Sequence, residues 1–548
     1  MRKRIGSIVS ILIVASLVLS GCGDAVKEGG AKDTVGAQAT GTVTPGGELV
    51  WALAGTVTSD SLDAHKAGFA PTTRVMRSIY DSLVVELPDH TIKPWLATSW
   101  ELSSDKKSYT FHLRKDVKFH DGTPFNAEAV KFNFDRIIDP ATKASSSINE
   151  LGSYQSTDVI DEFTVKVNFK SPFAPFLSNA AKVDLGFVSP TAVKEYGDAF
   201  PQNPVGTGPF KLKKITPSSQ VELEKNPDYN WGPSNAKHQG PAYLDKLTVK
   251  YVEEEATRVS VLQSKQVQVA DIIPPQNLVA LKADKNFNVQ ETELLQANFT
   301  LYLNIQKAPW NDLKIRQAFR SALDIDAAVK TIYLGTSKQG WSPLSPQQFG
   351  YTPTRENAYK VDVAKSNQTL EEAGWIKGAD GYRAKDGKRL TVEVIDTQGN
   401  REKRLDLIAI FTQQLKQVGI ELKVISLPTG TYTDRRNKGD YDLIAGSQFS
   451  GDPDVLRQLY STKGPSKQNN IAKTNDPKLD DLLEQGYLET DPEKRKTIYK
   501  DAQEYIIDQV YGIPTYVFNY SVASTKDVKG ITFDSPAWPV FYDAWIQK

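Results

Sequence analysis

The sequence predicts an α/β protein built of two or more lobes. Its 548 residues are too many for a single hydrophobic core, so more than one part of ordinary domain size is expected. The first half has the pattern of strands and hairpins with occasional helices, whereas strands and helices alternate from near Gln296 onward. Such alternation predicts crossover connections and a largely parallel sheet covered by helices.

Two stretches of the first half show the two-residue period of half-buried strands. Apolar side chains occupy every second position of residues 109–113 and again of residues 163–169. Between them, Asn126 is expected to cap a helix. The apolar contacts of that helix are expected from Ala129, Val130, Phe132 and Phe134.

The second half predicts a strand at residues 300–305, followed by an amphipathic helix. The apolar residues at three- and four-residue spacing in that helix are Ile315, Ala318, Phe319, Ala322 and Leu323. The elements expected after it are a strand at 390–395, a helix at 401–417, and strands at 420–426 and 441–445. Helices at 477–487 and 492–509 carry few apolar residues on one face and are expected on the surface.

Composition and charge exclude several functions. The 66 Lys and Arg residues balance 66 Asp and Glu residues, and no local basic patch stands out. Such a balance gives no net field to attract nucleic acid, so no nucleic-acid partner is expected. Cys22 is the only cysteine. The mature body therefore can have neither an internal disulfide nor a cysteine-built metal site.

The N-terminus has the pattern of an exported, lipid-anchored protein. Basic residues 2–4 precede an apolar run at 5–19, which is shorter than the roughly 20 residues of a spanning helix. Residues 19–22, Leu-Ser-Gly-Cys, resemble the bacterial lipobox, which implies cleavage before Cys22 and diacylglycerol on its sulfur. A plain cleaved signal or an uncleaved anchor is the alternative. Residues 23–46 are rich in Gly, Ala, Thr and Lys and predict a flexible tether.

Several motifs, taken together, resemble the peptide/nickel class of ABC-importer solute-binding proteins. The longest match runs from residue 94 to residue 137 and begins PWLATSWELSSDKKSYTF. The others are Tyr80-Asp81-Ser82-Leu83-Val84, the segment 204–210 (PVGTGPF), the segment 225–229 (KNPDY) with Trp231-Gly232, Asn304 with Asp312, Arg316, Gln317 and Ala318, Glu372-Ala373-Gly374-Trp375, and Ile513-Pro514. They cover nearly the whole body in the family's order, so the sequence is identified as a member.

The resemblance implies a two-lobed, periplasmic-binding-protein-like fold with an additional subdomain in the first lobe. It also implies that the chain crosses between the lobes twice, near residues 293–299 and 515–523. The expected organisation is a signal peptide at 1–21, a lipidated tether at 22–46, a first lobe of two subdomains at 47–295, a second α/β lobe at 296–518, and a C-terminal segment at 519–548 that returns to the first lobe.

Together with the lipobox at Cys22, the resemblance implies a lipid-anchored monomer on the extracytoplasmic face of the cell membrane, which passes a solute to an ABC importer permease and needs no cofactor. An oligopeptide or dipeptide is the expected ligand. A nickel-type metal chelate and an oligosaccharide are the alternatives. The five histidines show no ligand spacing, so no metal site is predicted; they are His65, His90, His112, His120 and His238.

The segment 446–454, GSQFSGDPD, departs from the dipeptide-binding pattern. In the dipeptide-binding members this segment resembles Trp-x-x-Asp followed by Asp-Pro-Asp. The Asp of the Trp-x-x-Asp group pairs with the peptide ammonium in those members. Alignment places Phe449 at that Asp and Gly446 at that Trp. An unpaired buried charge costs several kcal/mol, so ordinary dipeptide binding is in doubt. A gapped alignment gives the role to Asp452, which could instead cap a helix that begins near Val455.

Five residues are predicted to face the ligand. They are Trp341, Gln448, Phe449, Ser450 and Asp452. The resemblance places the Ser450 region at the end of a second-lobe strand, and such strand ends border the crevice of an open α/β sheet. Trp341 lies in a loop before Pro343 and is either a platform for the ligand or part of the core.

The sequence also bears on two other functional classes. The sequence contains no Gly-x-Ser-x-Gly turn, no His-Glu-x-x-His helix and no Gly-x4-Gly-Lys loop, so the protein is not expected to be an enzyme. A surface lipoprotein that senses peptides or acts as a chaperone without a transporter would use the same cleft.

Overall fold

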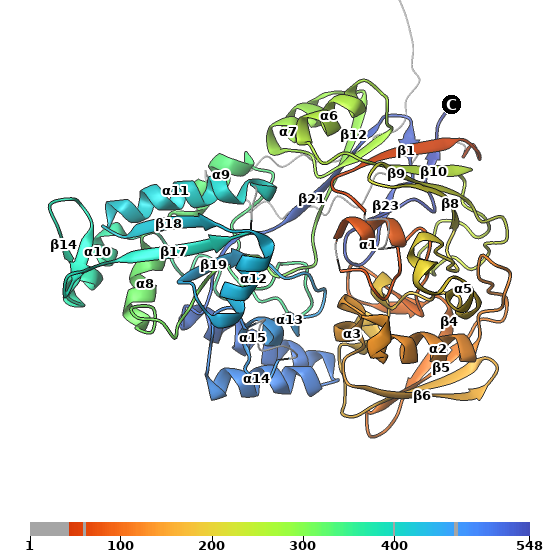
Figure 1. Ribbon diagram of the computed structural model, residues 1–548, viewed down its shortest axis with the longest axis horizontal. Helices are drawn as coiled ribbons and strands as arrows, with labels where there is room; N and C mark the ends of the chain where they lie inside the picture. The colour runs from red at the N-terminus through yellow and green to blue at the C-terminus, as the bar shows by residue number, and fades with distance from the viewer. Residues whose placement is uncertain (1–42, 58–61, 69, 398–399, 465–469) are drawn as a thin grey trace, which may run out of the picture. The chain divides into compact units, whose positions relative to one another are not determined.

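The computed structural model describes residues 43–57, 62–68, 70–397, 400–464 and 470–548 (Figure 1). The predicted signal peptide, Cys22 and most of the predicted tether lie outside the described residues. Within the described ranges, no helix combines the length and the apolar character needed to cross a membrane. The fold is built on three larger sheets, of seven, five and four strands. We call the part with the seven- and four-stranded sheets the first lobe, and the part with the five-stranded sheet the second lobe.

The seven-stranded sheet of the first lobe has the strand order β12-β21-β11-β1-β10-β9-β8. Its strands are β1 Glu48–Leu53, β8 Phe210–Thr216, β9 Gln220–Lys225, β10 Lys246–Tyr251, β11 Val269–Asp271, β12 Phe287–Glu293 and β21 Asn519–Thr525. Strand β1 pairs in parallel with β10 and β11, and the other neighbours are antiparallel. Helices α6 Glu255–Gln263 and α7 Pro275–Ala283 share a buried apolar cluster with β1, β11 and β21.

The four-stranded antiparallel sheet has the order β4-β5-β7-β6 and contains both predicted hairpin strands. Its strands are β4 Ala97–Leu102, β5 Ser108–Leu113, β6 Tyr154–Asp161 and β7 Thr164–Phe169. The predicted alternation is confirmed, because Tyr109, Phe111 and Leu113 are all buried. Helix α2 Ala127–Ile138 begins where predicted: the Asn126 side chain accepts a hydrogen bond from the amide of Ala129 at 3.1 Å.

Short elements complete the first lobe. The helices are α1 Ala70–Met76, α3 Ser146–Leu151, α4 Phe176–Asn179 and α5 Pro190–Tyr196, with single 3₁₀ turns at Pro140–Thr142, Val183–Leu185 and Gly197–Gln202. The strands are β2 Val84–Glu86, β3 Ile92–Pro94, β22 Val528–Lys529, β23 Thr532–Phe533, β24 Pro539–Val540 and β25 Trp545–Ile546. Trp538, Phe541 and Tyr542 near the C-terminus are buried in the main core of this lobe.

The five-stranded sheet of the second lobe has the order β18-β17-β19-β13-β20. Its strands are β13 Phe299–Leu303, β17 Thr391–Asp396, β18 Glu421–Ser426, β19 Leu443–Gly446 and β20 Ile513–Tyr516. Strand β17 is parallel to β18 and β19, whereas β13 is antiparallel to β19 and β20. The prediction of a largely parallel sheet is therefore wrong for half of these pairings. Strand β13 brings the chain in from the first lobe and β20 returns it, so these neighbours run in opposite directions.

Helices cover the second lobe. They are α8 Leu313–Ser321, α9 Ile325–Tyr333, α10 Val363–Glu372, α11 Arg404–Gln417, α12 Thr429–Lys438, α13 Val455–Tyr460, α14 Pro477–Leu488 and α15 Pro492–Asp508, with a 3₁₀ turn at Arg401–Lys403 and the short strands β14 Ile376–Lys377, β15 Arg383–Lys385 and β16 Lys388–Arg389. The expectation that α14 and α15 lie on the surface needs correction, because each has a deeply buried face. Leu479, Leu483, Tyr499, Ala502 and Ile506 lie in one core cluster.

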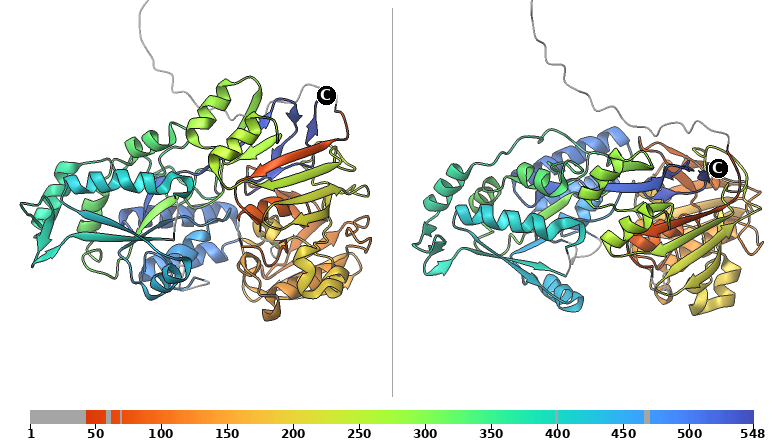
Figure 2. Two further views of the ribbon diagram at one scale, coloured as in Figure 1. Left: turned by 45° about the horizontal axis from the view of Figure 1, so that its top comes forward. Right: turned by 90° about the horizontal axis from the view of Figure 1, so that it is seen from above.

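The chain passes between the two lobes twice, in residues 294–298 and again in residues 517–518. After the second passage, β21 enters the seven-stranded sheet between β11 and β12. Both views of Figure 2 accordingly show the marked C-terminus beside the red and yellow elements of the first lobe. The positions of these passages agree with the expected crossings, and the residues at which the lobes divide stay a prediction.

Candidate functional site

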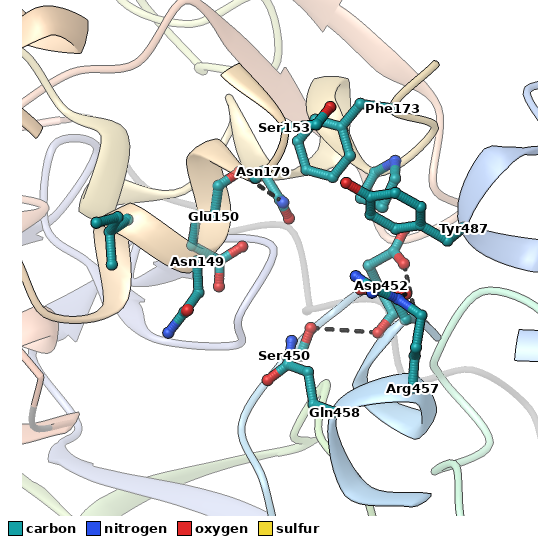
Figure 3. Close-up of a pocket in the computed structure, with 14 residues that line it drawn as sticks. Asn149, Glu150, Ser153, Phe173, Asn179, Ser450, Asp452, Arg457, Gln458 and Tyr487 are labelled. Carbon is teal, nitrogen blue, oxygen red and sulfur yellow. Dashed lines mark hydrogen bonds and ion pairs between the residues drawn. The ribbon is translucent and has the colours of Figure 1, made fainter. Parts of the chain in front are cut away.

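A cavity of about 220 Å³ is lined by side chains of both lobes (Figure 3). The first lobe contributes residues of α3, of α4 and of the loops beside them, and the second lobe contributes residues from the end of β19 to α14. Figure 3 shows Glu150 and Asn179 on one side, with Asp452 and Arg457 on the other. We call this cavity the Asp452 pocket.

Asp452 is held by a buried ion pair with Arg495 of α15. The Arg495 Nη1 and Nη2 atoms donate to the two carboxylate oxygens at 2.7 and 2.6 Å. The amide of Asp454 donates to the same carboxylate at 2.8 Å. Burial by itself raises the pKa of Asp452, but the Arg495 guanidinium outweighs it and lowers that pKa below its ordinary value. The Asp452 carboxylate is therefore an ionised group with its partners inside the protein.

Asp454 has an arginine partner of its own and the opposite pKa shift. It is the N-terminal cap residue of α13, and Arg457 of that helix donates to its carboxylate at 2.7 and 3.1 Å. Burial raises the pKa of Asp454 to about 6 despite this guanidinium. The Asp454 side chain accepts no hydrogen bond from the helix amides, and the Asp452 carboxylate accepts the amide of Asp454 just before the first helical residue.

Arg457 also connects the pocket to two aromatic rings. Its guanidinium carbon lies 3.9 Å from the ring centroid of Tyr487 in α14. The Tyr487 ring in turn lies 5.5 Å from that of Phe173 in the first lobe. Tyr487 is counted among the buried residues of the first-lobe core, although it belongs to the second lobe. These rings form a contact across the pocket between the two lobes.

The first-lobe wall carries a third acid-base pair. The Lys182 Nζ atom donates to Glu150 at 2.7 Å, and the lysine side chain is only 3% exposed. Burial and the nearby Glu150 raise the pKa of Asp184 to about 7. Glu150, Asp452 and Asp454, the three carboxylates that line the pocket, therefore each have a basic partner.

Phe449 and Gln448 contact the first lobe and the connection instead of lining this pocket. The Phe449 ring stacks on Trp538, with centroids 5.1 Å apart and an interplanar angle of 15°. Its backbone forms a bridge with Gln296, and the Gln448 carbonyl accepts the amide of Ala297 at 3.0 Å. At the position where dipeptide-binding relatives are expected to carry an aspartate, this chain therefore has a ring packed on another ring.

Trp341 lies at a second cavity, of about 580 Å³, in the second lobe. We call it the Trp341 cavity. Its aromatic wall includes Tyr351 and Tyr359, and the Trp341 and Tyr359 rings are 5.1 Å apart. No residue lines both cavities. Of the five residues predicted to face one ligand, only Ser450 and Asp452 therefore line a common pocket.

Sequence reasoning did not find Arg457, Tyr487, Phe173 or Glu150. Arg457 had a local signal, because it follows Asp454 at the three-residue spacing of helical ion pairs. The other three carry no pattern that marks them, since they reach the pocket only through the packing of separate elements. In the part of the chain that the structure describes, no group of three His, Cys, Asp or Glu side chains is placed to hold a metal ion.

Comparison with known proteins gives the class. Residues 91–503 match the family model of bacterial extracellular solute-binding proteins, family 5 Middle. The chain is 32% identical over 459 residues to the probable D,D-dipeptide-binding periplasmic protein DdpA of Escherichia coli K12, which covers 81% of this chain and 83% of that protein. It is 30% identical over 472 residues to the glutathione-binding protein GsiB of Pectobacterium atrosepticum, which covers 83% and 87%.

The fold agrees with these relatives. The crystal structure of NikA from Brucella suis, in complex with Fe(III)-EDTA, superposes with a TM-score of 0.81 at 26% identity and covers 91% of this chain and all of that one. The chain therefore belongs to the bacterial extracellular solute-binding proteins of family 5. Proteins of this class are two-lobed solute-binding components of ABC import and not enzymes. The predicted family and fold class are confirmed.

Proposed function

We propose that this protein captures a short peptide or peptide-like solute outside the cytoplasm and delivers it to an ABC importer permease. The observation that carries the proposal is the Asp452 pocket, which is polar and is walled by side chains of both lobes. A site formed by two lobes can enclose a solute when the lobes close. Two relatives support a peptide-like solute, because one is named a probable D,D-dipeptide-binding protein and the other a glutathione-binding protein.

The local charges restrict how such a solute would bind. Phe449, at the position of the expected aspartate, stacks on Trp538 outside the pocket, and the Asp452 and Asp454 carboxylates inside it are already engaged by Arg495 and Arg457. A free ammonium buried beside them would lack a partner, at a cost of several kcal/mol. The solute is therefore expected to be held there through neutral polar or aromatic groups, with any free ammonium placed elsewhere or left in water.

A second candidate is a metal chelate. The similarity to NikA, solved with Fe(III)-EDTA, favours it. The protein itself would then contribute a shaped polar pocket while the chelator supplies the metal ligands.

The N-terminal pattern supports a lipid anchor on the same protein. Acylation at Cys22 would hold a monomeric body at the outer face of the membrane, near the permease. Metabolic labelling with a fatty-acid analogue tests this step. Label is expected on the wild type and absent from Cys22→Ser, and label retained by that variant would disprove the anchor.

Native mass spectrometry of the full chain, purified without refolding, tests the nature of the solute. A co-purified mass that fragments as a peptide supports the first candidate, and a metal-containing mass supports the second. Calorimetry with a panel of dipeptides, tripeptides and glutathione provides the second arm. A ligand-free protein that also gives no heat with this panel would contradict the peptide proposal.

A further inference from the structure

His90 lies between a carboxylate of the first lobe and a carbonyl of the second lobe. It occupies the turn between β2 and β3, and its Nδ1 atom is 2.7 Å from Glu86 Oε1. Its Nε2 atom is 2.8 Å from the backbone oxygen of Gln347. Gln347 belongs to the loop at residues 345–350, which the second lobe holds through Gln348: the Nε2 atom of Gln348 donates to the Ser450 carbonyl at 2.6 Å. The imidazole is therefore a direct contact between the lobes.

Both partners of the ring can only accept hydrogen bonds. The other oxygen of Glu86 accepts the hydroxyls of Ser178 at 2.7 Å and Ser535 at 2.9 Å, and the Glu86 side chain is 3% exposed. The Glu86 carboxyl group thus serves as an acceptor for both hydroxyls, and a backbone carbonyl never donates. Each ring nitrogen must then carry a proton to satisfy both contacts. The geometry is that of an imidazolium, because a neutral ring has only one N–H.

We propose that His90 is a positioning residue that makes one contact between the two lobes depend on a proton. The protonated ring holds the loop at residues 345–350 against the first lobe. When the proton leaves, a neutral ring that keeps its N–H on Glu86 turns a lone pair toward the Gln347 carbonyl, and the hydrogen bond between His90 and Gln347 is lost. The biological consequence rests on the proposed function, because it links solute capture to pH.

The charged groups around His90 favour its protonated form. The His90 ring lies edge-on to Phe349, with ring centroids 5.9 Å apart. Arg495 and Lys496 both contact the Phe349 ring through cation–π interactions. The charged groups near His90 are Glu86, Asp89 and Asp452 among the acids, with Arg495 and Lys496 behind Phe349.

Burial lowers the pKa of His90, but the hydrogen bond that the ring donates to Glu86, together with the charge of Glu86, outweighs burial and raises that pKa above its ordinary value. Because the folded pKa is raised, the stabilisation is complete below the unfolded pKa. It disappears as the pH rises through the folded value. The contact is therefore expected at mildly acidic pH and is expected to weaken above neutrality.

His238 provides a matched control. Its Nδ1 atom lies 2.8 Å from Asp543 and its Nε2 atom 3.1 Å from the Pro241 carbonyl. The ring thus has the same pair of acceptors as His90, but all three residues belong to the first lobe. A substitution of His238 removes equivalent chemistry without touching the contact between the lobes.

Hydrogen exchange followed by mass spectrometry on the purified full chain tests the proposal. The readout is the protection of the loop at residues 345–350, at about pH 6 and about pH 8.5, after correction for the intrinsic exchange rate. Protection in the wild type and in His238→Gln should fall about fivefold between these conditions, as expected for one net hydrogen bond. His90→Gln should show the low protection of the loop at both pH values. His90→Lys, whose side chain stays charged, should show the high protection of the loop at both pH values.

Several outcomes would overturn the proposal. One is a wild-type loop whose protection does not change with pH. Another is a loss of loop protection in His238→Gln that equals the loss in His90→Gln. Histidine-labelled wild-type protein gives an independent arm by NMR, and a His90 ring already neutral at about pH 6 would also reject it. None of these measurements uses a solute. A failure to bind peptides would therefore contradict the proposed function while leaving the His90 result intact.

Discussion

The Asp452 pocket and the Trp341 cavity differ in how deeply their ion pairs are buried. The three carboxylates that line the Asp452 pocket each have a basic partner, and the Asp452–Arg495 pair is almost fully removed from water. The Trp341 cavity is walled partly by aromatic rings, and the Tyr359 hydroxyl has no hydrogen-bond partner among the described residues. The ion pair of Asp452 with Arg495 is buried, whereas the ion pair of Lys330 with Asp326 at the Trp341 cavity is exposed, and the buried contact there is between rings.

This difference has an energetic consequence. Removing one member of a buried ion pair leaves the other charge unpaired in a medium that solvates it poorly. Removing a polar atom that has no partner leaves nothing behind to satisfy. Substitutions in the two cavities should therefore differ in their effect on the free energy of unfolding by several kcal/mol.

Arg495→Met should cause the largest loss. It leaves the Asp452 carboxylate buried without its guanidinium, and such losses are about 3–5 kcal/mol. Denaturant unfolding at neutral pH measures the change. Lys496→Met, on the neighbouring and more exposed residue of the same helix, is the control and should change the free energy of unfolding by less than about 0.5 kcal/mol.

The double variant Asp452→Asn/Arg495→Met sharpens this result. Since neither charge remains unpaired, it should be more stable than Arg495→Met alone. The wild-type pair should also weaken in acid: the pKa of Asp452 is lowered in the folded state, so its stabilisation is lost as the pH falls through that folded value. Additive losses in the double variant would contradict the assignment of Asp452 as a buried anion.

Asp454 should show the opposite pH dependence within the same pocket. Its folded pKa is raised to about 6, so its contribution to stability is complete below the ordinary value and is lost as the pH rises through about 6. The stability of the wild type relative to Asp454→Asn should therefore fall by about 2 kcal/mol from about pH 4 to about pH 7. Urea unfolding of both proteins across this range measures it, and a constant difference would reject the raised pKa.

Phe449→Ala tests the ring that replaces the expected carboxylate. Loss of the stack on Trp538 should lower the free energy of unfolding by about 1–2 kcal/mol, since Phe449 is only half-buried. Phe449→Leu, which keeps apolar contact without the stacked geometry, should recover part of that loss. Thermal or denaturant unfolding distinguishes the two variants, and a stability unchanged in Phe449→Ala would mean that the stack contributes nothing.

Tyr359→Phe should have the smallest effect. The variant keeps the ring beside Trp341 and under Arg320, and it removes only a hydroxyl without a hydrogen-bond partner. We expect a change within about 0.5 kcal/mol by denaturant unfolding. A loss above about 1 kcal/mol would show that this hydroxyl is satisfied in solution and would remove the contrast between the two cavities.

The sequence alone identified much of the fold because its signals are local. The alternation at residues 109–113 marks one buried face of β5, and Asn126 marks the start of α2. Family motifs spread along the body predicted the two-lobed class, which the comparisons confirm. The mixed pairing of the second sheet escaped prediction, because a strand pattern says which face is buried and not which strand lies beside it.

The candidate site was predicted less well for the same reason. The sequence by itself marked the segment around Ser450 and Asp452 as important, and it showed that Phe449 stands where a carboxylate was expected. Only the tertiary structure decided which residues oppose it. Arg495 lies 43 positions from Asp452 in the chain, and Trp538 reaches Phe449 from the returning C-terminal segment. Periodicity and turn chemistry encode the local conformation, but the partner of a buried charge or ring is chosen by the packing of elements distant in sequence.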